Sequence, residues 1–207
     1  MSRRPRLFVV AAPSGAGKST LVNALLAREP RLRLSVSHTT RPMRPNEQDG
    51  RDYYFITVAD FQALAQRGMF LEHAQVFDNY YGTSKQQLED KLAAGFDVIL
   101  EIDWQGARQV RAAMPGCVSI FILPPSRAAL ETRLHKRKTD SDAVIVRRLR
   151  DSVSDMSHCL EFDYIVVNDT FEHAVNELET IVGGEAEAGN LRAGRPELAP
   201  LLRDLVY

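Results

Sequence analysis

A glycine-rich stretch near the start of the chain has the residue types and spacing of a phosphate-binding loop. It has the sequence APSGAGKST over residues 12–20. Gly15 and Gly17 allow backbone conformations that other residues avoid, so that successive N–H groups can point at one anion. Lys18 adds a charge that reaches β- and γ-phosphates, and the Ser19 hydroxyl is a ligand for Mg²⁺. The stretch therefore predicts a site for a nucleoside triphosphate.

The segments on either side supply the strand and the helix that such a loop, a P-loop, requires. An apolar run, Leu7–Ala11, precedes the loop, and apolar residues at helical spacing follow it over 21–28. The N-terminus of this helix adds unpaired N–H groups and a positive dipole end. The strict pattern begins with glycine where this chain has Ala12, and we expect that methyl group to be tolerated if its φ is negative. A purely structural turn is the weaker interpretation in this context.

A second signal lies at the end of an apolar run that contains two acidic residues. The run has the sequence DVILEID over 97–103. In P-loop proteins an apolar strand that ends in aspartate often helps to hold Mg²⁺, and Asp103 fits that position. Glu101 projects to the same side because strand side chains alternate. A polar strand end without a role is common, but beside a P-loop we favour a function, with Ser19 and Asp103 as metal ligands.

Two arginines in a proline-containing loop form a third candidate. Arg41 and Arg44 are three residues apart, so their guanidinium groups can converge on one phosphate, each in bidentate fashion. Tyr53 and Tyr81 can add hydroxyl donors to the same oxygens. From these residues alone, a solvated charged loop with core tyrosines is the favoured interpretation.

Apolar runs separated by helical patterns predict the frame that positions these residues. Runs over 97–103, 117–123 and 164–168 are of the buried type, which favours an α/β fold with a parallel sheet covered on both faces. A short additional strand is expected over 32–37.

Two segments differ from this frame in composition. Residues 38–84 have a β-rich pattern, including two strands over 69–76 and 79–82 that we expect to pair as an antiparallel hairpin. Residues 126–159 form two helical patterns with concentrated positive charge. Between positions 127 and 150 there are eight Lys or Arg residues and three acidic ones.

The overall composition excludes several classes of partner. The chain has 207 residues and a formal net charge of −1, which gives no global field for nucleic acid or a membrane. No apolar stretch approaches the length that spans a bilayer. Its two cysteines and five histidines show no metal-ligand spacing. We therefore expect a cytoplasmic protein without nucleic acid or membrane partners, and a homo-oligomer remains open.

A set of motifs together resembles the guanylate kinase family of the bacterial type, over about residues 7–182. The motifs are APSGAGKST, SVSHTTRPMR, GRDYYF, FLEHA, YYGT, LEIDWQG and IVVND. This resemblance implies a P-loop NTPase fold with three α/β/α layers and a parallel sheet. It also implies a CORE domain made of residues 1–36, 85–125 and 159–207, a GMP-binding domain at 37–84, and a helical LID at 126–158.

The resemblance also implies roles for individual residues, which are expectations at this point. The residues expected to bind ATP are Pro13, Ser14, Gly15, Ala16, Gly17, Lys18, Ser19, Thr20 and, near the adenine, Asn168. The residues expected to contact guanine are Ser37, Glu72, Thr83 and Glu101. Those expected to hold the GMP phosphate are Arg41, Arg44, Tyr53 and Tyr81. Asp103 is expected to bind GMP as well as the metal ion. The expected catalytic residues are Lys18, Arg41 and the LID arginines Arg133, Arg137 and Arg148.

The expected guanine contacts agree with the chemistry of the base. Guanine presents two adjacent N–H donors, and the carboxylate of Glu72 can accept both, whereas adenine presents an acceptor there. Such a mismatch leaves buried polar groups unpaired and discriminates by a factor of about 10⁴ or more. One departure from the family pattern concerns the LID, where Arg137 is followed by lysine and not by glycine.

The resemblance implies transfer of the γ-phosphate of MgATP to GMP, and to dGMP, with ADP and GDP as products. Three alternatives are kept. One is a nucleoside monophosphate kinase for AMP or UMP, which Glu72, Ser37 and Thr83 disfavour. Another is a catalytically inactive guanylate-kinase-like binding module, in which loss of the P-loop lysine or of the LID arginines would be expected. A regulatory GTPase is the third, although no guanine-reading loop of that class is evident.

Overall fold

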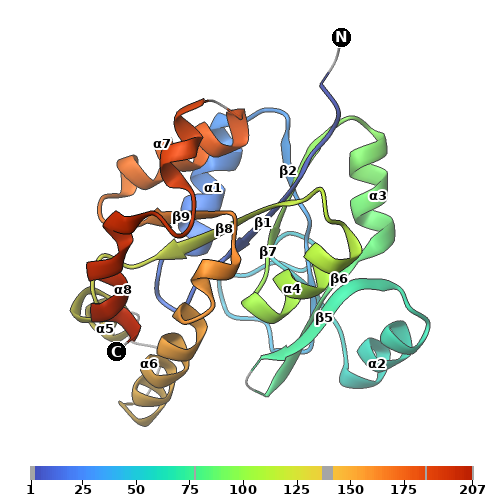
Figure 1. Cartoon of the computed structure of the whole chain (residues 1–207). Helices are drawn as coiled ribbons and strands as arrows, with labels where there is room; N and C mark the ends of the chain where they lie inside the picture. Colours follow the sequence, from blue (N-terminus) through green and yellow to red (C-terminus); the bar gives the residue numbers. More distant parts are fainter. Residues whose placement is uncertain (1–2, 77, 137–141, 185, 207) are drawn as a thin grey trace. The chain divides into compact units, whose positions relative to one another are not determined.

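The computed structural model describes residues 3–76, 78–136, 142–184 and 186–206 (Figure 1). The chain divides into two compact units. The first unit consists of Met1–Val9 and Arg31–Val118, and the second consists of Val10–Pro30 and Ser119–Tyr207. Within the described residues, no helix combines the length and the apolar character needed to cross a membrane.

The main sheet has five strands in the order β2-β7-β1-β8-β9. Their bounds are Leu32–Leu34 for β2, Asp97–Glu101 for β7, Leu7–Ala11 for β1, Val118–Leu123 for β8 and Tyr164–Val167 for β9. The pairs β2–β7 and β8–β9 are parallel. All five residues of β1 are buried, which agrees with the near-continuous apolar runs of the sequence. The predicted mixed α/β fold with a parallel sheet is confirmed.

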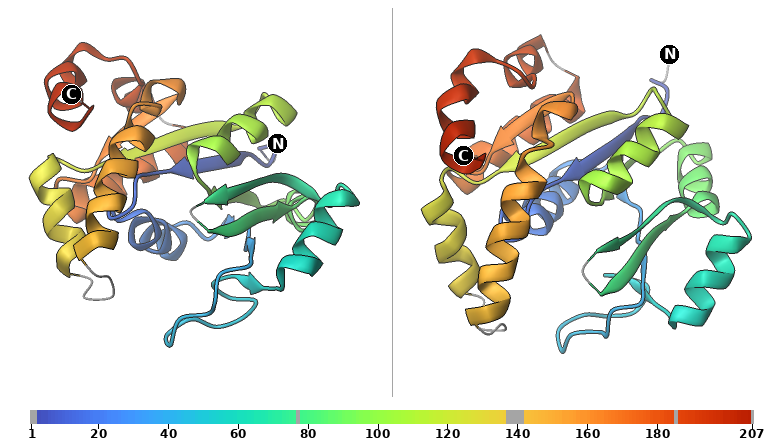
Figure 2. Two further views of the ribbon diagram at one scale, coloured as in Figure 1. Left: turned by 90° about the horizontal axis from the view of Figure 1, so that it is seen from below. Right: turned by 60° about the horizontal axis from the view of Figure 1, so that its bottom comes forward.

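A second sheet of four strands lies in the first unit, in the order β4-β3-β6-β5. The strands are β3 (His38–Thr39), β4 (Tyr54–Phe55), β5 (Phe70–Val76) and β6 (Asn79–Ser84). The expected hairpin is confirmed, because β5 and β6 pair in antiparallel register. It forms the long green ribbon pair of Figure 2.

The chain passes from one sheet to the other at the place where a single strand over 32–37 was expected. The Ser35 amide still donates to the Ile99 carbonyl at 3.0 Å, as a continuation of β2 beside β7. Two residues later, the Ser37 carbonyl accepts from the Tyr54 amide at 2.9 Å, in the second sheet. The apolar alternation continues through this crossing, so the sequence pattern does not reveal it.

The three helices of the first unit begin at side chains that bond the first turn. They are α2 (Val58–Gln66), α3 (Lys85–Ala93) and α4 (Trp104–Ala113). The N-cap residues are Thr57, Ser84 and Asp103, each of which accepts from an amide in the first turn. The strand expected to extend to Asp103 therefore ends at Glu101, because the Asp103 carboxylate accepts from the Gly106 amide at 2.7 Å and begins α4.

The second unit holds two pairs of neighbouring helices. α1 (Lys18–Arg28) packs on α7 (Phe171–Gly183), and α5 (Arg127–Lys136) packs on α6 (Asp142–Met156), as Figure 1 shows. The C-terminal helix α8 (Ala199–Val206) packs on α6. The remaining short helical turns of this unit are η1 (Cys159–Glu161), η2 (Ala186–Leu191) and η3 (Pro196–Leu198).

The N-cap of α2 allows a matched test of local stability. The Thr57 hydroxyl accepts from the Asp60 amide at 3.1 Å, whereas Thr170, the N-cap of α7, makes no such side-chain bond. We expect Thr57→Ala to lower the free energy of unfolding by about 1 kcal/mol, and Thr170→Ala to lower it by less than about 0.5 kcal/mol. Urea denaturation of both variants measures the difference. Equal losses would contradict the assignment of the cap bond.

Candidate nucleotide-binding sites

The glycine-rich loop of the second unit has the backbone shape that its sequence predicts. Gly15 and Gly17 have φ values of 90° and 93°, which L-residues with a side chain rarely adopt. The loop ends where α1 begins at Lys18, with Gly17 as the N-cap and no capping side chain. The first turn of α1 also lacks an acidic residue. The backbone N–H groups of this turn therefore point towards the space in front of the helix. An anion is the most favourable hydrogen-bond acceptor at that place.

The side chain of Asn168 fixes the shape of this loop. Its Nδ2 donates to the Ala16 carbonyl at 2.7 Å, and the residue is only 7% exposed. A Cβ atom added to Gly17 would lie 2.6 Å from the same Nδ2. The structure thus places Asn168 against the loop backbone, directly after β9, while its expected contact with adenine remains a prediction.

One of the three expected LID arginines also contacts this loop. The Arg133 guanidinium on α5 donates to the Asn168 carbonyl at 2.9 Å and to the Ala16 carbonyl at 3.4 Å. Arg148 lies on α6, half-buried. Arg137 lies outside the described residues.

Apolar and hydroxyl side chains of the same two helices reach the loop as well. A Cβ atom at Gly15 would meet the side chains of Leu130 and Leu134 on α5 at 3.0–3.1 Å. The buried Ser152 hydroxyl on α6 donates to the Ser14 carbonyl at 3.5 Å. Sequence reasoning did not single out Ser152, because a serine on an amphipathic helix carries no pattern that marks a distant partner.

In the first unit, three of the expected guanine contacts are buried polar residues. Ser37, Glu72 and Thr83 are 8%, 3% and 0% exposed. Glu72 of β5 is registered opposite Thr83 of β6, and the Thr83 hydroxyl donates to Glu72 Oε1 at 2.6 Å. A buried carboxylate is costly unless hydrogen bonds compensate its lost hydration, so this bond both stabilises Glu72 and fixes its orientation.

The helix α4 lies close to the other oxygen of the Glu72 carboxylate. A Cβ atom added to Gly106 would lie 2.6 Å from Glu72 Oε2, so only glycine fits there without a shift. Three residues further along, the Gln109 amide bonds the backbone of His73 in both directions, donating to its carbonyl at 2.9 Å and accepting from its N–H at 3.2 Å. Neither residue was predicted as part of the site, although Gly106 ends the quoted LEIDWQG motif.

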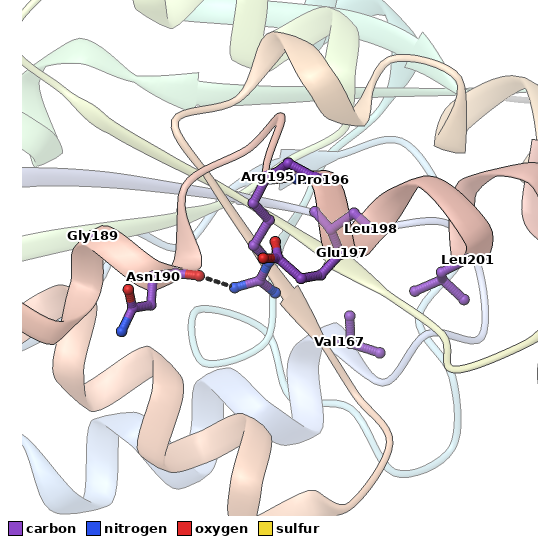
Figure 3. Close-up of a pocket in the computed structure, with 8 residues that line it drawn as sticks. All are labelled: Val167, Gly189, Asn190, Arg195, Pro196, Glu197, Leu198 and Leu201. Carbon is purple, nitrogen blue, oxygen red and sulfur yellow. Dashed lines mark hydrogen bonds between the residues drawn. The ribbon is translucent and has the colours of Figure 1, made fainter.

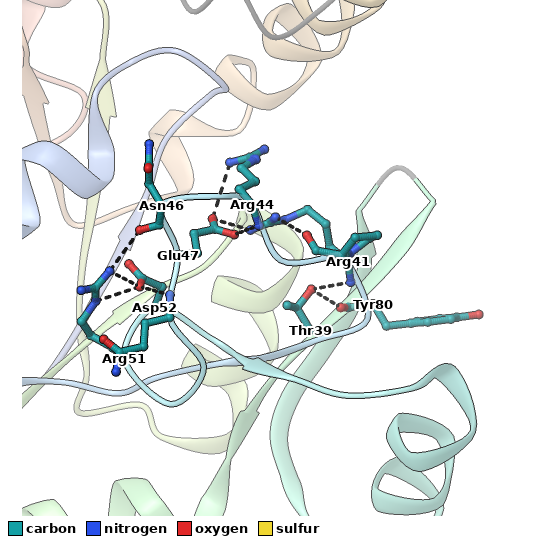
Figure 4. Close-up of polar contacts among 10 residues, drawn as sticks. Thr39, Arg41, Arg44, Asn46, Glu47, Arg51, Asp52 and Tyr80 are labelled. Carbon is teal, nitrogen blue, oxygen red and sulfur yellow. Dashed lines mark hydrogen bonds and ion pairs between the residues drawn. The ribbon is translucent and has the colours of Figure 1, made fainter.

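The two arginines expected to hold the acceptor phosphate share one carboxylate. Figure 4 shows Glu47 between Arg41 and Arg44. Arg41 Nη2 donates to Glu47 Oε1 at 2.7 Å, and the Arg44 amide donates to Glu47 Oε2 at 2.8 Å. The rings of Tyr53 and Tyr81 meet edge to face at 5.9 Å, with the Arg41 guanidinium 5.5 Å from the Tyr53 ring. The structure thus brings all four expected residues into one neighbourhood.

The environment of Tyr53 favours its neutral form. Burial raises the pKa of this hydroxyl to about 12, and the charge of Glu101 adds to the shift. Glu101, at the end of β7, is thereby placed near Tyr53, within the first unit. At neutral pH the Tyr53 hydroxyl is therefore a donor for an anion.

The two expected metal ligands supply oxygen donors of the kind that Mg²⁺ prefers. Ser19 is exposed in the first turn of α1, and Asp103 is half-buried at the start of α4. Among the described residues, no group of three or more His, Cys, Asp or Glu side chains could hold a metal ion by itself. Mg²⁺ usually keeps several waters and uses one or two carboxylates plus substrate phosphates, so a hydroxyl and a carboxylate fit this ion.

A cavity of about 530 Å³ in the second unit is lined by none of the predicted residues (Figure 3). Its lining consists of Val167 at the end of β9 and residues of the C-terminal segment: Gly189, Asn190, Arg195, Pro196, Glu197, Leu198 and Leu201. The Arg195 guanidinium donates to the Asn190 carbonyl beside it. We assign this cavity no role in nucleotide binding.

The positive φ of Gly17 and the nearby Asn168 amide make this glycine difficult to replace. We expect Gly17→Ala to lower the free energy of unfolding by about 2–3 kcal/mol. Gly95 is the matched control, since it has φ 88° but no atom within 4 Å of an added Cβ. Gly95→Ala should lose only the backbone part, about 1–2 kcal/mol. Urea denaturation compares the two, and equal losses would show that Asn168 does not restrict the loop.

The raised pKa of Tyr53 predicts a loss of stability in alkali. The folded state binds this proton more tightly than the unfolded chain, so the stabilisation is complete below pH 10 and is lost as the pH rises towards about 12. Between these pH values we expect the wild type to lose about 2 kcal/mol more unfolding free energy than Tyr53→Phe, which has no proton to release. If the unfolding free energies of the two proteins fell in parallel as the pH rises, the buried, neutral state of Tyr53 would be contradicted.

Comparison with known proteins identifies one family. The family model for guanylate kinase matches residues 4–185. A guanylate kinase of Methylococcus capsulatus is 54% identical over 200 residues, which are 97% of this chain and 97% of that protein. A guanylate kinase of Nitrosococcus oceani is 60% identical over 176 residues, which are 85% of this chain and 87% of that protein.

A solved structure gives the same result. The crystal structure of guanylate kinase from Anaplasma phagocytophilum matches with a TM-score of 0.73 and 35% identity, over 96% of this chain and 94% of that one. The segment matched by the family model includes the glycine-rich loop, the buried Glu72–Thr83 pair and the arginine loop. The chain therefore belongs to the guanylate kinase family.

Proposed function

We propose that this protein is a phosphotransferase that moves the γ-phosphate of ATP to GMP, with ADP and GDP as products. The observation that carries the proposal is the buried Glu72 carboxylate, which Thr83 orients, in a chain that also has a P-loop at the start of α1. Relatives named guanylate kinase at 54–60% identity support the same reaction.

The donor nucleotide is assigned to the loop of the second unit. Its backbone amides and the N-terminus of α1 would cradle the phosphates, and Lys18 would neutralise charge on the β- and γ-phosphates. Arg133 on α5 and Arg148 on α6 would neutralise charge on the phosphoryl group that is transferred. The same role is proposed for Arg137, on the basis of the sequence alone. Arg133 already lies against the loop, through its bond to the Ala16 carbonyl.

The acceptor nucleotide is assigned to the first unit. Glu72 would accept the two adjacent N–H donors of guanine, and the hydroxyls of Ser37 and Thr83 would complete the polar surface of the base site. Adenine would leave these buried groups unpaired, which is the physical basis for selecting GMP over AMP. Arg41, Arg44, Tyr53 and Tyr81 would hold the phosphate by charge-assisted hydrogen bonds.

Magnesium is proposed to accompany ATP, with Ser19 and Asp103 as the protein ligands. When bound, the ion would offset negative charge on the phosphates. No protein nucleophile is required, because an oxygen of the GMP phosphate attacks the γ-phosphorus directly. The protein then contributes positioning and electrostatic stabilisation, through Lys18 and the arginines of α5 and α6.

The wider assignments rest on the same reaction. We propose that residues 126–158 act as a LID that excludes water during transfer, that 37–84 bind GMP, and that the remaining segments form the CORE. We also propose a cytoplasmic location, where both nucleotides are used, a role in purine nucleotide supply, and activity on dGMP, which presents the same base and phosphate.

A coupled assay of ADP formation tests the proposal. With ATP in excess, we expect turnover with GMP and a kcat/KM for AMP that is lower by about 10⁴-fold. Equal rates with the two nucleotides, or no turnover with GMP, would overturn it.

The same assay tests the P-loop lysine. Lys18→Ala should lower kcat by about 10²-fold or more. Lys85 is a matched control, because it is also the first residue of its helix and its Nζ bonds the Gly68 carbonyl. Lys85→Ala should leave kcat within about twofold of the wild type. Normal turnover by Lys18→Ala would contradict the role of the loop.

A further inference from the structure

The contacts of Glu47 make it the centre of the arginine loop. Its two carboxylate oxygens have different partners, Oε1 accepting from Arg41 Nη2 at 2.7 Å and Oε2 from the Arg44 amide at 2.8 Å. The Arg44 guanidinium is further away, with Nη1 3.8 Å from Oε1. Glu47 therefore ties the side chain of one arginine to the backbone of the other, as Figure 4 shows.

These contacts leave Arg41 with a defined orientation. Its other terminal nitrogen, Nη1, donates to the Pro42 carbonyl at 2.7 Å. The guanidinium lies 5.5 Å from the Tyr53 ring and 5.7 Å from the Phe55 ring. A guanidinium has five N–H donors, and the bonds to Glu47 and Pro42 use two of them. Further N–H groups of Arg41 can therefore donate to a ligand. Holding a long side chain in this way reduces the entropy that it loses when a ligand binds.

Burial separates the roles of the two arginines. The side chains of Arg41 and Glu47 are 14% and 16% exposed, whereas that of Arg44 is 54% exposed. Burial alone would raise the pKa of Glu47, but hydrogen bonds from Arg41 and from the Arg44 amide outweigh it and lower the pKa. The carboxylate is therefore ionised at neutral pH, and it forms a half-buried ion pair with Arg41 but only a loose one with Arg44.

We propose that Glu47 is a positioning residue of the acceptor site, which holds Arg41 against Tyr53 so that the guanidinium is ready for the phosphate of the acceptor nucleotide. The inference rests on the proposed function, in which Arg41 binds that phosphate. Glu47 does not touch the nucleotide in this role. It acts through Arg41 and through the backbone at Arg44.

The opposite role would be competition, in which the carboxylate occupies the place of the phosphate and must leave. The two roles predict changes of opposite sign when the charge is removed. In Glu47→Gln the side chain has one carbonyl oxygen in place of two carboxylate oxygens. It therefore cannot accept from the Arg41 guanidinium and from the Arg44 amide with a separate oxygen for each, as Glu47 does. A positioning residue then weakens phosphate binding when it is lost, whereas a competitor strengthens it.

Calorimetric titration of GMP and of guanosine into Glu47→Gln separates these roles. We expect the Kd for GMP to rise about tenfold, the size of one lost bond to a charged group, and the Kd for guanosine to stay within about twofold. In the kinetic assay, KM for GMP should rise by a similar factor, with a much smaller change in kcat and in KM for ATP.

Asp52 provides a matched control in the same loop. Its Oδ2 accepts from the Gln48 amide at 2.8 Å and from Arg51 Nε at 2.9 Å, so it links a backbone amide to a guanidinium as Glu47 does. Asp52→Asn removes the same charge without touching Arg41 or Arg44, and it should leave the Kd for GMP within about twofold. If Glu47→Gln does not fold, Glu47→Asp, whose shorter side chain cannot span both partners, is judged by the same criteria.

Several results would overturn the inference. They are unchanged or tighter GMP binding by the Glu47 variant, an equal loss of guanosine affinity, or an equal loss in Asp52→Asn. If the wild type phosphorylates GMP while one of these results is obtained, only the role of Glu47 is wrong. If the wild type binds neither GMP nor guanosine, the proposed function fails and the inference fails with it.

Discussion

The hydrogen bond from the Asn168 amide to the Ala16 carbonyl is the contact on which the shape of the glycine-rich loop depends. It joins the residue that follows β9 to the middle of a loop whose two glycines have positive φ. Arg133 adds to the same point, because it bonds the carbonyls of both Ala16 and Asn168. The loop is thus held through the carbonyl of Ala16, and it leads into the N-terminus of α1, which is a favourable place for an anion. A loop shaped before the ligand arrives loses less entropy on binding.

The first unit uses a different constraint, the placement of a buried carboxylate. Glu72 is 3% exposed, and the Thr83 hydroxyl on the paired strand donates a hydrogen bond that compensates part of its lost hydration. The absence of a side chain at Gly106 leaves room for its second oxygen. A carboxylate that is already oriented and shielded from water can select one base edge. With the wrong base, no water molecule is available to satisfy the polar groups that stay unpaired.

The sequence predicted those features that depend on local chemistry. The loop at 12–20, the hairpin of β5 and β6 and the apolar strands of the parallel sheet each have a pattern within a few residues, and all are present. The crossing between the sheets at Ser35–Ser37 was missed, because its hydrogen-bond partners, Ile99 and Tyr54, are remote in the chain. The sequence predicts Asp103 at the end of a strand, whereas it caps α4, because an acidic residue after an apolar run suits a strand end and a helix cap equally.

The site residues follow the same rule. Gln109 and Ser152 could not be found from the sequence, because the partner that makes each of them notable is remote in the chain and only the fold brings it near. Glu47 lies within a few residues of its partners, yet no spacing rule separates it from the other charges of its loop. The division into CORE, GMP-binding and LID segments, and the roles of individual residues, stay predictions.

The amide of Gln109 has a further consequence for the behaviour of the protein in solution. β5 is an edge strand of its sheet. An edge strand presents backbone N–H and C=O groups with which a strand of another chain can pair. By bonding both the N–H and the carbonyl of His73, the Gln109 side chain occupies the place of a neighbouring strand at that residue. At His73, next to Glu72, one glutamine on a helix therefore occupies the backbone groups that an added strand would need.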